Sequence, residues 1–561
     1  MQALNPSTMP LAGVNLIEAS AGTGKTYTIT TLYLRLLLGL YDETTTLSGK
    51  SVDQLLVVTF TEAATEEIRE RVRSRLQEMR HCLLIAQEQG TDINEGDPVL
   101  KTLLTRVSDI KAAWHQLDAA IKSLDEAAIF TIHGFCHRML QQHAFESGSM
   151  FTETFILDES ELVSQAVNDV WRQHTFDLKP AILDVVLNRW NHPEALLRDI
   201  LPILHRDFAE VQPALMLSDI DNMADRYETL VKAIKSSWLT DDIPELLQQS
   251  DLSTARKPGK AAYIDAMTEF AQSDQLFFKD LGLWTTDSIS KPGNLKGKKV
   301  APVHSIFNLF DQAVPLSLDY ESSIFAWFKA MARREVKERL AIAKQKQAKL
   351  SPDDLLTRLA HALRQDETGA LRKAIAAQYP VALIDEFQDT DPLQYQIFST
   401  IYQMGSEKLD TTEDIVESDG NRYPPDESNP LLIMIGDPKQ AIYGFRGADI
   451  FTYIDAKTRV SDGGKYTLDT NWRSNSRLIS VVNHIFQRHP SPFIFDQQIP
   501  FIDVRSAGKN DSAALTLNGS QTSVMHVWHL TQDNEVPFTR QAAMPHLAEA
   551  TANEISMLPK Q

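Results

Sequence analysis

The sequence has 561 residues, of which 43% are hydrophobic and 23% charged, and it predicts a globular protein of three or four structural units. A formal net charge of −20 excludes a protein coated in positive charge, so any contact with nucleic acid must be local. No apolar run is long enough to span a bilayer and residues 1–10 lack the pattern of a secretion signal, which predicts a cytoplasmic protein without a membrane partner.

Short apolar runs along the chain predict the buried strands of a parallel sheet. They are residues 14–17, 55–58, 127–130, 381–384 and 431–435. Each run ends in polar residues. In a parallel sheet helices cover both faces, and the ligand site lies beyond the carboxyl ends of the strands. We therefore expect an α/β fold with its site at that edge.

The first run leads into a glycine-rich turn. Its residues are Ala19, Ser20, Ala21, Gly22, Thr23, Gly24, Lys25 and Thr26. The backbone N–H groups of such a turn and of the helix after it point toward phosphate oxygens. Lys25 is expected to bridge the terminal phosphates, and the Thr26 hydroxyl to bind Mg²⁺. Ala19 departs from the general pattern, which has glycine there, and the alternative is an ordinary turn before a helix.

Residues 155–350 lose the strand signal and show helical periodicity with charged faces, which predicts a helical insertion. Positive charge is dense at residues 329–349 and in the loops 256–260 and 296–299. Two interpretations stay open for this charge. It contacts duplex DNA, or it forms a solvated helix face and ordinary loops.

Polar residues after the later runs suit the hydrolysis of a nucleotide. Asp385 and Glu386 follow one run, where a metal-binding carboxylate and a base that polarises water are needed. Gln440 follows another and suits a sensor of the γ-phosphate. Trp472 and Arg473 offer a stacking ring and a charge for that phosphate. Taken singly, each residue also suits a surface, a helix cap or a core.

In this order, the four segments resemble the motifs of superfamily-one DNA helicases of the UvrD and RecB type. Further matches are residues 58–64 with motif Ia, 130–135 with motif Ib, 384–390 with motif II, 435–448 with motif III and 471–474 with motif IV. Residues 18–26 and 385–392 look most like the RecB branch, in which alanine is common at the position of Ala19. The resemblance implies a RecA-like P-loop NTPase fold and the cofactors ATP and Mg²⁺.

By this resemblance, the catalytic residues are Lys25, Asp385, Glu386, Gln440 and Arg473, with Thr26 and Asp385 on the metal and Trp472 stacked on adenine. Single-stranded DNA would meet Phe60, Thr61, His133, Tyr443, Phe445 and Arg446. Aromatic faces accept any base by stacking, which suits a motor that tolerates all sequences. The alternative for Phe60 and Phe445 is core packing.

The resemblance also implies a domain plan and a whole-protein function. The plan is residues 1–154 for the first part of RecA-like domain 1A, 155–350 for the insertion, 351–450 for the second part of 1A with motifs II and III, and 451–561 for the start of a second RecA-like domain. Helicase motifs V and VI and a nuclease domain are expected after residue 561, so we interpret the chain as an N-terminal motor fragment.

The implied function is a 3′-to-5′ DNA helicase subunit of a helicase-nuclease, exodeoxyribonuclease V, in the repair of double-strand breaks by recombination. The implied partners are single-stranded DNA, duplex ends, and RecC-like and RecD-like subunits. The alternatives are a UvrD-type or AddA-type repair helicase, and a fragment that binds DNA and partners without catalysis.

Overall fold

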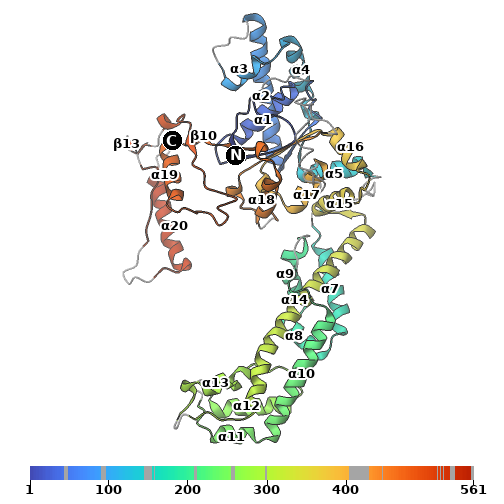
Figure 1. Cartoon of the computed structure of the whole chain (residues 1–561), viewed down its shortest axis with the longest axis vertical. Helices are drawn as coiled ribbons and strands as arrows, with labels where there is room; N and C mark the ends of the chain where they lie inside the picture. Colours follow the sequence, from blue (N-terminus) through green and yellow to red (C-terminus); the bar gives the residue numbers. More distant parts are fainter. Residues whose placement is uncertain are drawn as a thin grey trace, which may run out of the picture. The chain divides into compact units, whose positions relative to one another are not determined.

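A computed structural model gives the fold in two compact units. It describes residues 1–42, 48–89, 96–144, 154–156, 158–206, 211–253, 259–296, 300–402, 429–444, 447–513, 516–517, 520–521, 523–530 and 537–557. One unit, which we call the sheet unit, joins Met1–Phe151 with Asp354–Gln561. The other, the insertion unit, is Thr152–Asp353 (Figure 1).

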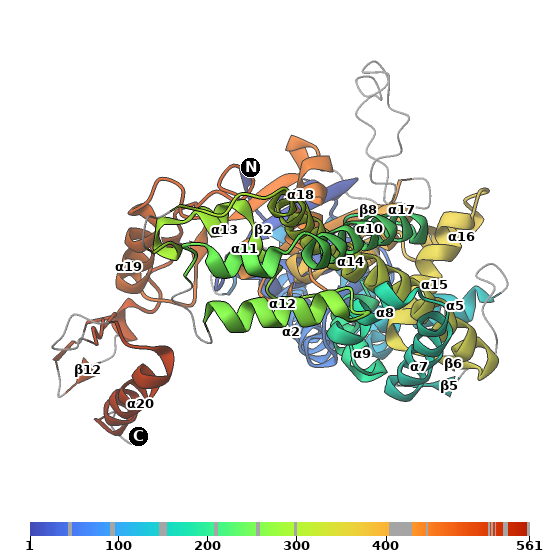
Figure 2. The same cartoon turned by 90° about the horizontal axis from the view of Figure 1, so that it is seen from below.

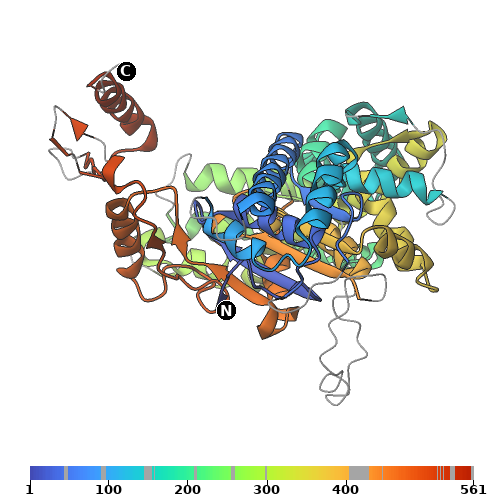
Figure 3. The ribbon, with the colours of Figure 1, turned by 90° about the horizontal axis from the view of Figure 1, so that it is seen from above.

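A parallel sheet is the centre of the sheet unit. Its strands, in spatial order, are β1 (Gln2–Ala3), β9 (Lys465–Leu468), β2 (Val14–Ala19), β8 (Leu431–Gly436), β7 (Val381–Ile384), β3 (Leu55–Thr59) and β4 (Ile129–Thr131). Ile17 pairs with Ile435, and Leu383 pairs with both Ile433 and Val57. Figure 3 shows strands from the blue N-terminal and orange C-terminal parts of the sequence side by side. The predicted α/β fold with a parallel sheet is confirmed.

Helices pack around the sheet, against its strands or against one another. They are α1 (Lys25–Leu37), α2 (Glu62–Gln89), α3 (Pro98–Leu104), α4 (Ile110–Lys122), α5 (Ile132–Gln142), α15 (Pro352–Gln365), α16 (Ala370–Gln378), α17 (Pro392–Ile401) and α18 (Ile450–Arg459). In α1, even Arg35 is buried, where its guanidinium donates to the carbonyls of Leu40, Pro6 and Tyr41. This burial fixes the helix that follows the phosphate loop. Short 3-10 helices are η1 (Leu124–Glu126), η4 (Phe387–Asp389), η5 (Pro438–Gln440), η7 (Asp462–Gly464) and η8 (Asp511–Ala513).

The insertion unit is helical around an aromatic core. Its helices are α7 (Ser160–Phe176), α8 (Pro180–Arg189), α9 (Pro193–Leu204), α10 (Leu217–Thr240), α11 (Ile243–Gln249), α12 (Lys260–Gln272), η2 (Leu281–Trp284), α13 (Thr286–Ser290), η3 (Pro292–Asn294) and α14 (Ile306–Lys346). Trp190, Trp238 and Phe328 are buried among them, and α11 and α12 lie beside each other in Figure 2. The unit begins and ends in a parallel pair, β5 (Thr154–Phe155) with β6 (Lys349–Leu350).

The residues after α18 do not all leave the first sheet. β9 pairs with β2, although the predicted second domain starts at residue 451. Beyond it come β10 (Thr470–Asn471), α19 (Ser476–Gln487), β11 (Arg505–Ser506), β12 (Thr516–Leu517), β13 (Ser520–Gln521) and α20 (Arg540–Met557). The four-part domain plan stays a prediction, with residues 465–468 reassigned to the first sheet. None of the described helices is long and apolar enough to cross a membrane.

Candidate nucleotide and DNA site

The phosphate loop connects β2 to α1 through two glycines with left-handed backbones. Gly22 has φ 77° and Gly24 has φ 96°, conformations in which a side chain is strained. Gly24 is the N-cap of α1 and provides no side-chain cap, so the first N–H groups of the helix stay available to an anion. Thr23 Oγ1 donates to the Ser20 carbonyl at 2.7 Å and closes the turn. This donor set fits the phosphates of ATP.

Lys25 and Glu386 form the central ion pair of the site. Lys25 Nζ lies 2.5 Å from Glu386 Oε2, and the lysine side chain is 14% exposed. Glu386 has φ 50°, which is uncommon for a residue other than glycine and occurs often at functional sites. The structure therefore brings together the predicted phosphate-binding cation and the predicted base.

Asp385 directly follows β7 and is half-buried. Burial raises the pKa of its carboxyl to about 6, and the neighbouring Glu386 charge adds to the rise, while Lys25 and the backbone N–H of Glu386 oppose it. That N–H donates to Asp385 Oδ1 at 2.9 Å. At neutral pH the carboxyl is ionised, as a ligand for a divalent cation must be. Thr26, the other predicted metal ligand, is half-buried at the start of α1.

Gln440 is held by Asp437, which directly follows β8. Gln440 Nε2 donates to Asp437 Oδ2 at 2.8 Å, and Lys439 Nζ lies 2.9 Å from Asp437 Oδ1. The Asp437 backbone N–H in turn donates to Gln388 Oε1 at 2.9 Å. Gln440 is thus joined through Asp437 and Gln388 to the end of β7.

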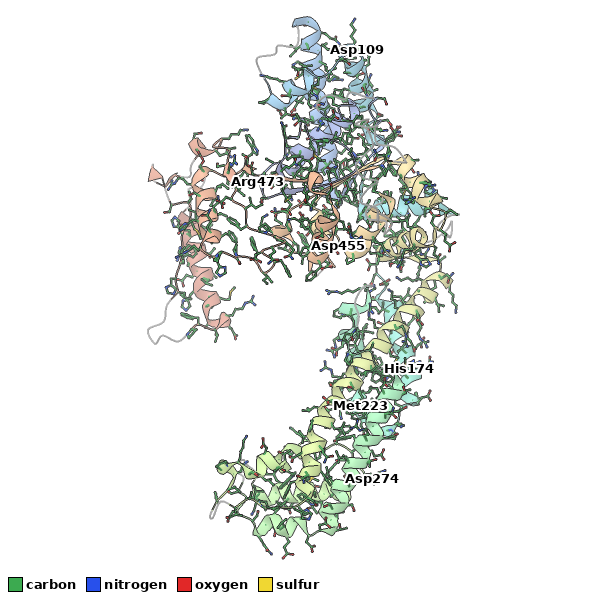
Figure 4. The ribbon with its side chains drawn as sticks, in the orientation of Figure 1. Asp109, His174, Met223, Asp274, Asp455 and Arg473 are labelled. Atoms are coloured by element: carbon green, nitrogen blue, oxygen red, sulfur yellow. The ribbon has the colours of Figure 1, made fainter. Side chains whose placement is uncertain are left out.

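The segment with Trp472 and Arg473 is fastened to the phosphate loop. Asn471 Nδ2 donates to the Ala21 carbonyl and the Trp472 N–H donates to the Gly22 carbonyl, both at 2.8 Å. A Cβ added to Gly22 would lie 2.8 Å from Asn471 Nδ2 and 2.9 Å from Arg473 Cβ, so this close approach requires glycine. Arg473, labelled in Figure 4, is exposed, and so is the Trp472 ring. Both predicted nucleotide ligands lie beside the phosphate loop.

The described DNA residues follow β3, β4 and β8 at the same edge of the sheet. The rings of Phe60 and Tyr443 stack with centroids 6.2 Å apart and planes at 21°. Thr61 directly precedes α2 after β3, and His133 lies in the first turn of α5 after β4, which pairs with β3. Phe445 and Arg446 lie outside the described residues. Phe60 is half-buried, and Thr61 is exposed.

Several residues of the basic segment of the insertion, residues 329–349, contact their own unit. Arg333 donates to the carbonyls of Ile203 and Arg206, and Lys344 pairs with Glu159 and donates to Ser351 Oγ at 2.9 Å. His174, labelled in Figure 4, meets Glu335 at 2.6 Å. These contacts tie α14 to α7 and α9. Of the predicted basic loops, residues 256–258 and 297–299 lie outside the described residues.

The sequence model of the UvrD/REP helicase N-terminal domain matches residues 2–461. The chain belongs to the UvrD/REP helicase family. The family resemblance predicted from the motifs is confirmed, and membership of this helicase family implies the use of ATP.

Within the UvrD/REP family, proteins named RecBCD enzyme subunit RecB are similar to nearly the whole chain. The protein of Escherichia coli (strain K12) is 38% identical over 540 residues, which are 94% of this chain and 42% of that protein. The Haemophilus influenzae protein is 34% identical over 575 residues, 96% of this chain and 45% of its own length. The Chlamydia trachomatis protein is 29% identical over 502 residues. The chain spans less than half the length of these relatives.

Sequence reasoning assigned no role to several buried polar residues of the site. Gln388 and Asp389 follow Glu386, and Asp437 and Asn471 lie in the other motif segments. Each is at most 6% exposed. The sequence indicates these residues only as polar side chains that directly follow an apolar strand or lie close to a predicted ligand. Their hydrogen-bond partners could not be predicted, because these depend on which strands are neighbours in the sheet.

Proposed function

We propose that the chain is the motor part of an ATP-dependent 3′-to-5′ DNA helicase subunit in a RecBCD-type helicase-nuclease. The observation that carries this proposal is the Lys25–Glu386 pair at the carboxyl ends of β2 and β7. At the same edge of the sheet, Phe60 after β3 stacks on Tyr443 after β8. Nucleotide chemistry and sequence-tolerant stacking are the two functions that a DNA motor must combine.

The proposal gives each side chain of the site a role. The loop N–H groups and Lys25 would bind phosphate oxygens, and Asp385 with Thr26 would hold Mg²⁺, which supplies charge neutralisation when bound. Glu386 is within reach of Lys25 and suits a base for water. Gln440 and Arg473 would meet the γ-phosphate, and Trp472 would stack on adenine.

Substrates and partners of the whole protein are part of this proposal. The relatives are named as subunits of the RecBCD enzyme, which supports an assembly with RecC-like and RecD-like subunits. Duplex ends and single-stranded DNA would be the substrates, in the cytoplasm, during recombinational repair of double-strand breaks. We assign no described residue to the nuclease reaction.

The test is Lys25→Ala, compared with Lys122→Ala on the exposed surface of α4. Loss of the Lys25 ammonium should lower DNA-stimulated ATP turnover at least a hundredfold and abolish unwinding of a duplex with a 3′ tail by the complete enzyme that contains this sequence, because the phosphate charge loses its cation. Lys122→Ala should match the wild type. Unchanged turnover in Lys25→Ala would falsify the proposal.

A further inference from the structure

Gln388 is a buried glutamine between the ends of two neighbouring strands. It follows β7 in η4, is 2% exposed, and reaches toward the end of β8. The approach to β8 is so close that a Cβ on Gly436 would lie 2.6 Å from Gln388 Oε1. A glycine at that position therefore lets the amide fit between the two strand ends.

The surroundings fix the orientation of the Gln388 amide. Oε1 accepts the backbone N–H of Asp437, a donor that no side-chain rotation can remove. Nε2 consequently faces the carboxylates of Glu386, at 2.8 Å, and Asp389, at 3.3 Å. Only a group with an acceptor at one atom and a donor at the other satisfies both sides, and among side chains of this length the amide is that group.

These bonds connect the side chain of Glu386, after β7, to the backbone of Asp437, after β8. On one side, Gln388 Nε2 and Lys25 Nζ donate to the same oxygen of Glu386. On the other side, Asp437 holds Gln440 and Lys439, and Tyr443 follows three positions later in the loop that stacks on Phe60. One buried side chain thus connects the proposed base to the proposed DNA loop.

We propose that Gln388 is a positioning residue that couples the orientation of Glu386 to the loop bearing Gln440 and Tyr443, so that ATP turnover responds to single-stranded DNA. The inference rests on the proposed function. Gln388 touches neither nucleotide nor DNA in this scheme. It acts because the two polar atoms of its amide cannot move independently. A shift of the Asp437 backbone moves Gln388 Oε1, and the hydrogen bond from Gln388 Nε2 to Glu386 then changes.

The variants are Gln388→Leu, which removes both bonds, and Gln388→Glu, which replaces the donor toward Glu386 by another acceptor. Gln394→Leu is the matched control, because Gln394 is a buried glutamine of the same unit, 5% exposed, on the next helix α17. Asp437→Asn is a milder change. It keeps the hydrogen bond from the backbone N–H to Gln388 and weakens only the side-chain contacts with Lys439 and Gln440.

The first measurement is the binding of a fluorescent ADP and of a single-stranded oligonucleotide to each variant. ADP affinity should stay within about threefold of the wild type, because the phosphate loop is intact. The wild-type oligonucleotide affinity should change when a non-hydrolysable ATP analogue is added, by the fivefold or more that is usual for coupled sites. In both Gln388 variants and in Asp437→Asn this change should disappear.

The second measurement is ATP turnover by the complete enzyme with and without single-stranded DNA. Stimulation by DNA should fall at least fivefold in the Gln388 variants and persist in Gln394→Leu. If the wild type is stimulated and Gln388→Leu and Asp437→Asn are stimulated equally, the inference is wrong while the proposed function stands. If the wild type neither binds ATP nor responds to DNA, the proposed function itself fails. Should Gln388→Leu not fold, Gln388→Glu decides the matter, because it removes only the donor toward Glu386.

Discussion

Three carboxylates gather around a single lysine at the end of β7. Asp389 is buried, Asp385 is half-buried, Glu386 is about one-third exposed, and Lys25 pairs with Glu386 at hydrogen-bond distance. Burial and the Glu386 charge raise the pKa of Asp389, like that of Asp385, to about 6. Asp389 Oδ1 is buried without a hydrogen-bond partner among the described residues. The site therefore holds more negative charge than its own cations offset.

The excess charge at Asp389 makes stability depend on pH. Its pKa is raised in the folded state, so the folded protein binds the proton more tightly than the unfolded chain, and stability falls as pH rises from about 4 to about 6. Above pH 6 the ionised carboxylate costs the folded state on the order of 3 kcal/mol. Asp389→Asn removes this cost. We expect it to stabilise the sheet unit at pH 7.5 and to have little effect at pH 4.

Urea unfolding of the wild type and Asp389→Asn, followed by pulse proteolysis at both pH values, measures the difference in unfolding free energy. Asp455→Asn, on the half-exposed face of α18, is the control and should show no such pH-dependent gain. A destabilised Asp389→Asn at pH 7.5 would mean that the carboxylate is retained for a favourable contact.

A single residue could be assigned from the sequence where one local pattern points to one chemical role. Lys25 could be assigned as a phosphate ligand because a strand, two glycines and a helix are consecutive in sequence, and the structure forms that strand, turn and helix. Gln388 could not be assigned in this way. Its role depends on Asp437, 49 positions away, and this neighbour follows from the order of β7 and β8 in the sheet.

At the level of elements, the residues of the site lie together because they follow the carboxyl ends of parallel strands. β2, β7 and β8 end at the nucleotide residues, and β3 and β4 end at Thr59 and Thr131, just before the proposed DNA residues. Since these strands are neighbours in register, motifs hundreds of residues apart share one edge. The fold explains why each motif begins where an apolar run ends.

The stack of Phe60 on Tyr443 at this edge predicts a specific defect. Phe60→Ala should weaken binding of single-stranded DNA about fivefold to a hundredfold, because stacking of a base on an aromatic ring contributes about 1–3 kcal/mol. The dependence of affinity on salt should not change, since no phosphate contact is lost. Fluorescence anisotropy with a labelled oligonucleotide at several salt concentrations measures both quantities.

Phe176→Ala is the control for this stacking prediction, because Phe176 is 86% exposed at the end of α7 in the insertion unit. Its DNA affinity should equal that of the wild type. If Phe60→Ala binds DNA normally but unfolds more easily, Phe60 belongs to the core, which was the alternative left open by the sequence.

Apolar runs identified the strands that are buried on both faces, and missed those that are not. β9 reads Lys-Tyr-Thr-Leu, and only Tyr466 of the four is buried. β1 has two residues, both exposed. Hydrophobic periodicity carries little signal at such a sheet edge. The partly polar sequence of β9 forms no apolar run, so the sequence did not indicate that residues 465–468 belong to the first sheet.

For the whole molecule, the division into two units predicts that damage to one spares the chemistry of the other. Trp238 is fully buried in the insertion unit, where its Nε1 donates to Thr268 Oγ1 at 3.0 Å and its ring meets Trp284 edge-on at 5.2 Å. Trp238→Ala should destabilise that unit by about 3–5 kcal/mol. ADP affinity should stay within about twofold of the wild type.

Calorimetry should show that the transition of the insertion unit moves to lower temperature in Trp238→Ala while that of the sheet unit is retained. Leu239→Ala, the next residue of α10 and 46% exposed, is the control. Loss of ADP binding in step with the lowered transition would show that the two units fold as one.

The short pair of β5 with β6 has a thermodynamic consequence. A disordered loop of about 200 residues would cost about 3 kcal/mol more closure entropy than one of about ten residues. Thr154 pairs with Lys349 and Phe155 with Leu350, so the folded insertion brings its own two ends together. For the sheet unit, the folded insertion therefore acts like a short linker between the phosphate loop and the segment with Asp385 and Glu386. A large helical module can be carried at this point of the chain with little entropic cost.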